Sequence, residues 1–247
     1  MASAWPLAAA GELPPSFFHE RSAETLPCQA KSSHLFCWHW ATEHIGRFGT
    51  PTVQQLELVV LSVLAGFAVA FVLALIAHRH GWLRPPLLTA TGILFTIPSL
   101  AFFFLLLPIT GLGRVTAVIV LAAYTLQIIY RNTILGLANV PGSVKDSARG
   151  MGLTERQILW RVELPLATPE IIAGLRVATV STMAIATLAV FVHAGGLGTQ
   201  IYSGGNLTFP TAVILAAGIA MLMAFGLDLI LLGIQHLTTP WRRAVSG

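Results

Sequence analysis

Residues 146–165 read DSARGMGLTERQILWRVELP, and this stretch decides how the rest of the chain is interpreted. It is a long charged segment between apolar runs. Charges of both signs are interleaved in it and beside it, and they include Lys145, Asp146, Arg149, Glu155, Arg156, Arg161, Glu163 and Glu170. Such a segment cannot lie in lipid, because unpaired charges are costly there. We therefore expect a structured docking element outside the bilayer.

Break and cap signals divide this stretch into two short helices. Gly150 and Gly152 supply the backbone freedom for a break or a left-handed cap. Thr154, with Gln157 three residues later, fits the capping box that begins a second helix. Pro165 is expected to end that helix, because proline cannot continue one. The pattern predicts a compact helix-turn-helix.

The same stretch resembles the EAA loop of bacterial ABC-importer permeases. That loop has an acidic residue, a small residue and Ala, a Gly four residues later, and then aliphatic-x-Leu-Pro. The matching positions are Asp146, Ser147, Ala148, Gly152, Val162, Leu164 and Pro165, with Arg149 and Gly150 between them. The resemblance implies that the loop, here 139–168, docks in a cytoplasmic ATPase subunit. The alternative is an ordinary amphipathic loop.

The composition is that of a polytopic membrane protein. Hydrophobic residues make up 55% of the 247 residues and charged residues only 10%. The net charge of +4 does not indicate nucleic-acid binding, because no basic tract with interleaved aromatics is present. Most cations instead flank the apolar runs, as the positive-inside rule predicts.

Five apolar runs are each near the roughly 20 residues that cross a bilayer. They cover residues 53–77, 87–107, 115–129 (or 115–132), 171–192 and 211–234. We expect an all-α integral membrane protein, and the resemblance narrows this to the type I, MetI-like permease fold. Residues 1–50 form a tail with an aromatic-rich interfacial segment, 51–240 the transmembrane domain, and 241–247 a short cytoplasmic tail.

The cations also predict the orientation. The segments after the first, third and fifth runs are rich in cations, whereas residues 194–209 carry no charge and the turn after the second run carries only Arg114. The N-terminus is therefore expected outside and the C-terminus in the cytoplasm. Cys28 and Cys37 then lie on the outer side, where they either pair or remain two thiols.

Pro98 interrupts the second apolar run. It frees a backbone carbonyl, which we expect the hydroxyl of Thr96 or Ser99 to satisfy. The result is either a static kink or a bend that lines the translocation path. Similar Ile-Pro-Ser residues occur in the glycine betaine/osmoprotectant branch of these permeases. Pro98, Ser99 and Tyr124 are therefore candidates for that path.

Two opposite charges lie inside the last two apolar runs. Arg176 is about six residues into the fourth run, and Asp228 is about six residues before the end of the fifth. Both are expected at a similar depth, where unpaired charges are unfavourable. We predict that they form an ion pair or share a polar network that locks the helices without contacting substrate.

A glycine-rich segment, His193-Ala194-Gly195-Gly196-Leu197-Gly198, follows the fourth run. Its glycines predict a tight turn or a close backbone approach. It is not a nucleotide-binding loop, because no strand precedes it. Osmoprotectant permeases carry a similar GAGGLG, which makes Gly195, Gly196 and Gly198 further candidates for the path.

The resemblance to the osmoprotectant branch covers residues 56–243. It implies a bacterial inner-membrane permease subunit that imports glycine betaine, proline betaine, carnitine or choline-type solutes by alternating access. The sequence has no G-x-x-x-x-G-K-[ST] loop, so ATP-Mg is expected on a separate ATPase dimer. No catalytic residue, cofactor or metal is expected on this chain.

Three further partners are implied. They are a solute-binding protein, a second permease subunit that is either the same chain or a paralogue, and the lipid bilayer. The serious alternative within the family is a methionine-type amino-acid importer. A secondary transporter is disfavoured, because the runs show no internal repeat and no ionisable residue near the midplane. A non-transport membrane scaffold would leave the ordered charged loop unexplained.

Overall fold

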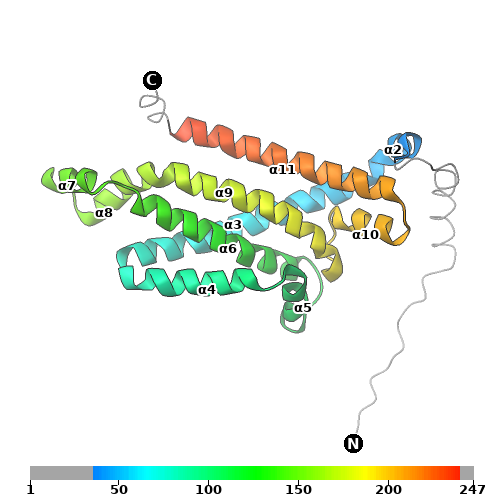
Figure 1. The fold of residues 1–247 in the computed structure, drawn as a ribbon, viewed down its shortest axis with the longest axis horizontal. Coiled ribbons are helices and arrows are strands. Elements are labelled where there is room, and N and C mark those ends of the chain that lie inside the picture. Colours follow the sequence, from blue (N-terminus) through cyan, green and yellow to red (C-terminus); the bar gives the residue numbers. More distant parts are fainter. Residues whose placement is uncertain (1–35, 240–247) are drawn as a thin grey trace, which may run out of the picture.

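The computed structural model describes residues 36–239, and within that range the ordered elements are all helices (Figure 1). A π-helical turn, Leu159–Glu163, joins α8 to α9, and a 3-10 segment, Thr187–Val192, follows α9. The α-helices in chain order are α2 (Trp38–His44), α3 (Gly49–Arg79), α4 (Arg84–Thr96), α5 (Ser99–Thr110), α6 (Arg114–Ala138), α7 (Gly142–Gly150), α8 (Glu155–Ile158), α9 (Leu164–Ala186), α10 (Gly198–Asn206) and α11 (Pro210–Thr238).

The core of the bundle is formed by α3, α6 and α9. Helix α6 packs against both of the others, α4 packs on α6, and α11 lies along α9 (Figure 1). The main apolar cluster joins Leu58 and Val59 of α3 to Val120 and Leu121 of α6 and Met183 of α9. Burial of these side chains holds together helices that are far apart in sequence.

Within residues 36–239, four helices are long and apolar enough to cross a membrane, or five if the bent pair α4–α5 is one span. The expected all-helical membrane fold with five crossings is confirmed in this sense. The short helices lie at the ends: α7 and α8 at one end of the bundle, α2 and α10 at the other (Figure 1).

The second crossing differs from the single run expected at 87–107. Helices α4 and α5 meet at 97°. The break is at Ile97, whose φ of −64° and ψ of 127° are extended. A residue before proline is forced out of the helical region by the proline ring, and Pro98 has no N–H to continue the ladder. The chain therefore breaks here rather than kinks.

Two other sequence-based boundaries were wrong. The third crossing, expected at 115–129, continues as α6 to Ala138. Pro165, expected to end a helix, instead lies in the first turn of α9. Proline is tolerated there because the N–H it lacks would have no intrahelical partner, and the preceding π turn has already altered the hydrogen-bond ladder. The helical path thus runs on through Glu155–Val192.

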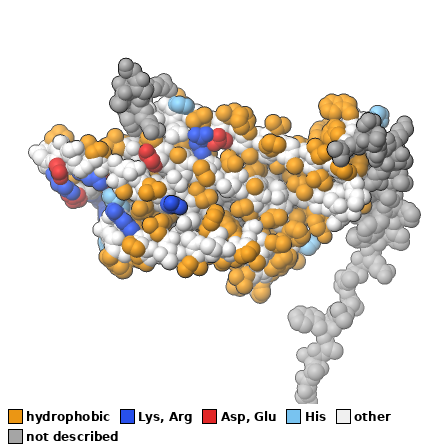
Figure 2. Space-filling model, in the orientation of Figure 1, with side chains coloured by type: hydrophobic (Ala, Val, Ile, Leu, Met, Phe, Trp, Pro, Cys, Tyr) orange, Lys and Arg blue, Asp and Glu red, His pale blue; other side chains and the backbone are white. Residues whose placement is uncertain are grey.

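Charged side chains are distributed unevenly along the molecule. In Figure 2 they gather toward the end that carries α7 and α8, while the visible face of the remaining bundle is largely hydrophobic. The segment between α3 and α4, the α7–α8 region and the C-terminal end of α11 share that end (Figure 1). The segments expected to be cytoplasmic therefore lie together. Arg242 and Arg243 lie outside the described residues.

A close approach between α3 and α6 makes Gly66 a sensitive position. A Cβ added there would overlap Thr125 Oγ1 and lie 2.8 Å from the carbonyl oxygen of Ala122. Gly66→Ala should therefore lower the midpoint of thermal unfolding in detergent, at a cost of about 1–3 kcal/mol from overpacking. Gly218→Ala on α11, where an added Cβ meets nothing, is the matched control. An equal midpoint for the two variants would contradict the close packing.

Candidate functional site

The hairpin formed by α7 and α8 is closed by two well-defined caps. Gly152 has φ +82°, the left-handed conformation that glycine adopts without strain. The N–H of Leu153 donates to the Ala148 carbonyl and that of Gly152 to the Arg149 carbonyl, which is a Schellman motif. The expected capping box of Thr154 with Gln157 is confirmed. The turn between the helices is thus fixed by its own backbone.

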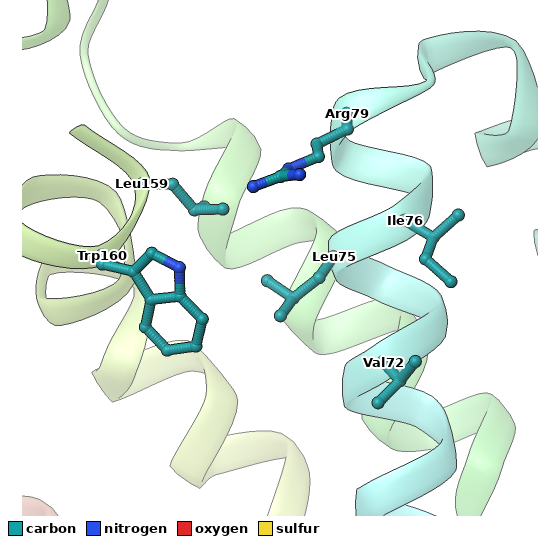
Figure 3. Close-up of a pocket in the computed structure, with 6 residues that line it drawn as sticks. All are labelled: Val72, Leu75, Ile76, Arg79, Leu159 and Trp160. Carbon is teal, nitrogen blue, oxygen red and sulfur yellow. The ribbon is translucent and has the colours of Figure 1, made fainter. Parts of the chain in front are cut away.

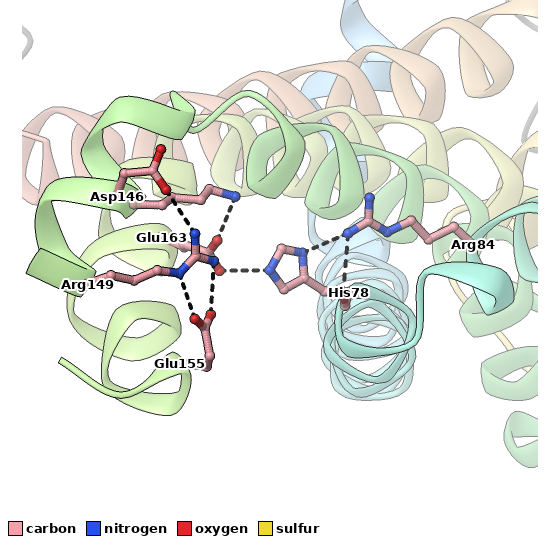
Figure 4. A network of polar contacts seen from close by, with 7 residues as sticks. His78, Arg84, Asp146, Arg149, Glu155 and Glu163 are labelled. Atoms are coloured by element: carbon pink, nitrogen blue, oxygen red, sulfur yellow. Dashed lines mark hydrogen bonds and ion pairs between the residues drawn. The ribbon is translucent and has the colours of Figure 1, made fainter. Parts of the chain in front are cut away.

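Arg149 ties the two helices of the hairpin together. Its Nε lies 2.7 Å from Glu155 Oε1 and its Nη1 2.9 Å from Asp146 Oδ1 (Figure 4). The hydrogen bond from Arg149 holds the pKa of the Glu155 carboxyl below its usual value near 4.5. Because this pKa is lower in the folded state than in the unfolded state, the contact contributes its full stabilisation of the hairpin at pH values above about 4.5, the pKa of the unfolded carboxyl. The stabilisation is lost as the pH falls through the lowered pKa of the folded state. Its contribution is small, because both groups are exposed.

A buried carboxylate anchors the hairpin to the bundle. The side chain of Glu163, in the π turn, is only 7% exposed. Lys145 Nζ of α7 lies 2.6 Å from Glu163 Oε1, and His78 Nε2 of α3 lies 2.7 Å from Oε2 (Figure 4). Arg84 Nη2 lies 3.2 Å from His78 Nδ1. An arginine can only donate, so Nδ1 accepts and the imidazole proton is assigned to Nε2, facing the carboxylate.

The other predicted hairpin residues have clear structural positions. Ser147 donates a hydrogen bond to the Ser143 carbonyl, and Ala148 is 1% exposed and faces the interior of the hairpin. Gly150 is the last residue of α7, Val162 lies in the π turn, and Leu164 is buried at the start of α9. Asp146 and Arg149 remain exposed. The site therefore presents a rigid, charged surface on a buried anchor.

The two charges predicted to pair do so. Arg176 Nε and Nη2 lie 2.8 and 2.7 Å from the two carboxylate oxygens of Asp228. Arg176 Nη1 also lies 3.4 Å from Gln235 Oε1, and Gln235 Nε2 donates to the Pro169 carbonyl at 3.0 Å. This network joins α9 to α11 and leaves both charges satisfied within the bundle.

At the break between α4 and α5, the expected hydroxyl partner is found in Thr96. The N–H of Ile97 donates to the Leu94 carbonyl, which leaves the Ile93 carbonyl free, and Thr96 donates its hydroxyl to it at 2.7 Å. Tyr124 of α6, which sequence reasoning did not predict as a partner, donates its hydroxyl to the Ile97 carbonyl. Because Tyr124 is buried, the break is held by a neighbouring helix as well as by a local side chain. Whether Pro98, Ser99 and Tyr124 line a path stays a prediction.

The glycine-rich segment approaches α3 closely. The N–H of Gly196 donates to Gln54 Oε1 at 3.1 Å, and that of Leu197 to Gln55 Oε1 at 3.2 Å. Gly195 and Gly196 have φ of +83° and +88°. A Cβ on Gly198 would overlap the Thr187 carbonyl. The predicted tight turn and close approach are confirmed, and a role in the path stays a prediction.

Several residues that build these sites were missed from the sequence. They are His78, Lys145, Glu163, Gln54, Gln55 and Gln235. Glu163 was identified only as one of the interleaved charges and as the variable position of an aliphatic-x-Leu-Pro pattern, yet it is the least exposed acid of the described chain. A single acidic residue two positions before a proline does not predict burial of its side chain. The burial of Glu163 becomes apparent only when its partners from α3 and α7 are seen in the structure.

No group of three or more His, Cys, Asp or Glu residues in the described part of the chain could hold a metal ion. Cys37 is disulfide-bonded, and the chain's other cysteine, Cys28, lies outside the described residues. The aromatic segment expected in the interface forms α2, where Trp40 packs edge-on against Phe209, with ring centroids 4.7 Å apart. Neither feature adds a chemical site.

Comparison with known families identifies the class. Residues 62–243 match the family described as "Binding-protein-dependent transport system inner membrane component". The chain belongs to this family. It is therefore an ABC-importer permease, a multi-pass protein of the bacterial inner membrane. The hairpin of α7 and α8 lies within the matched range.

Curated relatives of the permease carry related names. The osmoprotectant import permease protein OsmW of Salmonella typhimurium is 34% identical over 82% of this chain and 96% of its own length. The choline transport system permease protein OpuBD of Bacillus subtilis is 34% identical over 81% and 87%. OpuCD of the same organism, a glycine betaine/carnitine/choline permease protein, is 36% identical over 75% and 80%.

Solved structures agree on the fold. The permease superposes on a chain of the MetNI methionine ABC transporter with a TM-score of 0.72, at 19% identity, over 78% of this chain and 96% of that one. An amino acid ABC transporter gives a TM-score of 0.69 at 17% identity, over 81% and 98%. The expected MetI-like fold is confirmed, and at these identities the likeness shows the fold alone.

The Glu163 anchor should control how firmly the hairpin is held. In Glu163→Leu, Lys145 and His78 lose their buried partner, so amide hydrogen exchange in residues 142–158 should rise by about tenfold or more. The matched control is Glu170→Leu, another acid seven residues along the chain with no ion pair in the described structure. Unchanged protection in Glu163→Leu would show that the hairpin does not depend on this carboxylate.

The pair between α9 and α11 should respond to charge removal and exchange. Arg176→Leu leaves Asp228 without its partner inside the bundle, so the midpoint of thermal unfolding in detergent should fall by roughly 5 °C. Exchanging the two residues (Arg176→Asp with Asp228→Arg) should recover part of the loss. If the thermal midpoint does not fall in Arg176→Leu, the ion pair does not hold the two helices together.

Proposed function

We propose that this permease is the membrane-spanning half of an ATP-driven importer of quaternary-ammonium osmoprotectants: glycine betaine, proline betaine, carnitine or choline-type solutes. Relatives at 34–36% identity that align with most of this chain are named for osmoprotectant, for choline, and for glycine betaine, carnitine and choline transport. The amino-acid alternative is less favoured, because its structural relatives are only 17–19% identical. The solute class is therefore drawn from sequence relatives and the fold from structural ones.

The observation that carries the proposal is the anchored hairpin of α7 and α8. It projects from one end of the bundle with exposed charges on its surface, while Glu163 ties its base to α3 (Figures 1 and 4). We infer that this surface docks on the ATPase subunit. That assignment puts the end carrying α7 and α8 in the cytoplasm, and the N-terminus on the outer side.

The rest of the machine lies on other chains. ATP-Mg binds and is hydrolysed on an ATPase dimer, and a solute-binding protein delivers the solute. Five crossing helices enclose little of a path, so two permease subunits face each other, as two copies or as a copy and a paralogue. This chain contributes no catalytic residue, cofactor or metal site. Its helices adopt two alternative packing arrangements, and ATP binding to the ATPase shifts the equilibrium between them.

The contacts suggest how movement is transmitted. A displacement of the hairpin reaches α3 through the bond between Glu163 and His78, and reaches α9 directly, because the π turn continues into it. Helix α9 is tied to α11 by Arg176 and Asp228. Movement of the ATPase would thus shift three crossing helices together, which is the rigid-body behaviour that alternating access requires.

The solute class has its own physical logic. A quaternary ammonium cannot donate a hydrogen bond, so it is recognised by aromatic faces through cation–π attraction. We place that recognition mainly in the separate binding protein. The permease then needs only a path with weak, transient contacts, since tight binding in the membrane would slow release.

The turn of the hairpin gives the decisive test. Gly152→Val forces a β-branched residue into a left-handed conformation, which costs about 1–2 kcal/mol and shifts the equilibrium away from the native turn by about 5- to 30-fold. Glycine betaine import in a reconstituted complex should therefore fall. Gly152→Asn should import nearly normally, because asparagine tolerates this conformation. Asp146→Lys reverses a docking charge without altering the turn and should also reduce import.

Three measurements separate the possible causes. Co-purification of the ATPase reports docking, solute-stimulated ATP hydrolysis reports coupling, and thermal unfolding of the permease reports folding. Normal import and normal stimulated hydrolysis in both Gly152→Val and Asp146→Lys, in an assembled complex, would show that the hairpin is not the coupling element. Import of methionine but not of glycine betaine by the wild-type complex would remove the solute assignment alone.

A further inference from the structure

A groove of about 260 Å³ opens between the end of α3 and the π turn, next to the hairpin. Val72, Leu75, Ile76 and Arg79 of α3 form one wall, and Leu159 and Trp160 form the other (Figure 3). All the lining residues except Arg79 are apolar or aromatic. The proposed coupling mechanism uses none of them. The groove is therefore an apolar slot with a single cation.

The cation has no protein partner in the described structure. Figure 3 shows the Arg79 side chain reaching across the groove toward Leu159. No ion pair or hydrogen bond of its guanidinium is found among residues 36–239. The acid of the neighbouring network, Glu163, is already engaged by His78 and Lys145. A guanidinium without an acid among these residues suits a bidentate pair with an external anion.

The groove lies where the acyl chains of a bilayer meet its headgroups. Val72 and Ile76 are 54% and 44% exposed on a helix long and apolar enough to cross the membrane, so their side chains are open to contact with lipid. Arg79 is the last residue of α3, and Trp160 on the opposite wall is 52% exposed. Tryptophan and arginine at the end of a crossing helix are typical of this boundary.

We propose that this groove binds one anionic phospholipid. The Arg79 guanidinium pairs with the headgroup phosphate, Trp160 supplies its indole edge beside it, and an acyl chain lies along Val72, Leu75 and Ile76. The charge favours an anionic lipid over a zwitterionic one, because the guanidinium of Arg84 nearby adds to the positive potential. The bound lipid bridges α3 to the π turn and so stiffens the base of the hairpin.

The test is direct lipid binding to the full-length permease in its complex, after removal of lipid in detergent. The probes are dioleoylphosphatidylglycerol, dioleoylphosphatidylcholine and glycerol 3-phosphate, and binding is measured by native mass spectrometry and by the shift in thermal midpoint. The wild type should retain phosphatidylglycerol preferentially. Arg79→Gln should bind it about fivefold more weakly, as expected for loss of one cation at a membrane surface, and Arg79→Lys should retain most of the binding.

Two further variants separate the groove from its charge. Ile76→Trp fills the apolar slot while keeping Arg79, and it should weaken phosphatidylglycerol binding as well. Arg161→Gln removes the same charge from an exposed residue that does not line the groove, and should bind like the wild type. If Arg79→Gln does not fold, Arg79→Lys and Ile76→Trp carry the comparison.

Several outcomes would overturn the proposal. These are equal retention of phosphatidylcholine and phosphatidylglycerol, an equal effect of glycerol 3-phosphate, or an equal loss in Arg161→Gln. Normal binding by both Arg79→Gln and Ile76→Trp would do the same, as would a groove covered by the ATPase in the assembled complex. None of these readouts depends on transport, so failure here leaves the proposed function untouched.

Discussion

A polar group inside a bilayer has no water to bind, and this constraint shapes the interior of the permease. Several polar side chains in the bundle meet a partner from another segment: Arg176 meets Asp228, Gln55 meets the Leu197 N–H and the Met183 carbonyl, and Tyr124 meets the Ile97 carbonyl. Because such bonds are directional, they fix helix positions that apolar packing alone would leave free to slide.

The same constraint acts on Glu163 at the edge of the bilayer. A buried carboxylate needs positive or donor partners on both oxygens, and here Lys145 and His78 provide them from two different helices. The result is a joint between the hairpin and α3. The hairpin itself is rigid for a separate reason, since the Schellman motif at Gly152 and the capping box at Thr154 satisfy its backbone locally. A rigid element on a strong joint is suited to transmitting force.

The lipid groove extends this arrangement to the membrane itself. Its walls belong to the two segments that Glu163 joins, α3 and the π turn. A lipid wedged there adds apolar contact and one charge pair to the same joint. The stiffness of the joint then depends on membrane composition as well as on protein contacts, which offers the bilayer a physical influence on how the helices move together.

The sequence by itself determined that the protein is a polytopic membrane protein with a structured, charged hairpin between two of its crossings. Apolar runs of crossing length, cations concentrated in alternate loops, and the cap and break signals of residues 146–165 are local or periodic, so they can be recognised without coordinates. The Arg176–Asp228 pair was also predictable, because two lone charges at equal depth have few other options. The position of Pro165 in the first turn of α9 was not predictable from the sequence. A proline can end a helix or begin one, and here the preceding π turn decides between the two.

Only the tertiary structure decided the partners. Glu163, Gln55 and Tyr124 look ordinary in the sequence, since nothing nearby shows that they meet groups 85, 142 and 27 residues away. The 97° break between α4 and α5 likewise appears only in the folded chain, as does the position of Arg79, which has no ion pair within residues 36–239, beside an apolar groove. A local sequence pattern predicts the secondary structure of a segment and whether it crosses the membrane. The partners of a side chain across the bundle depend on which surfaces the folded chain brings into contact.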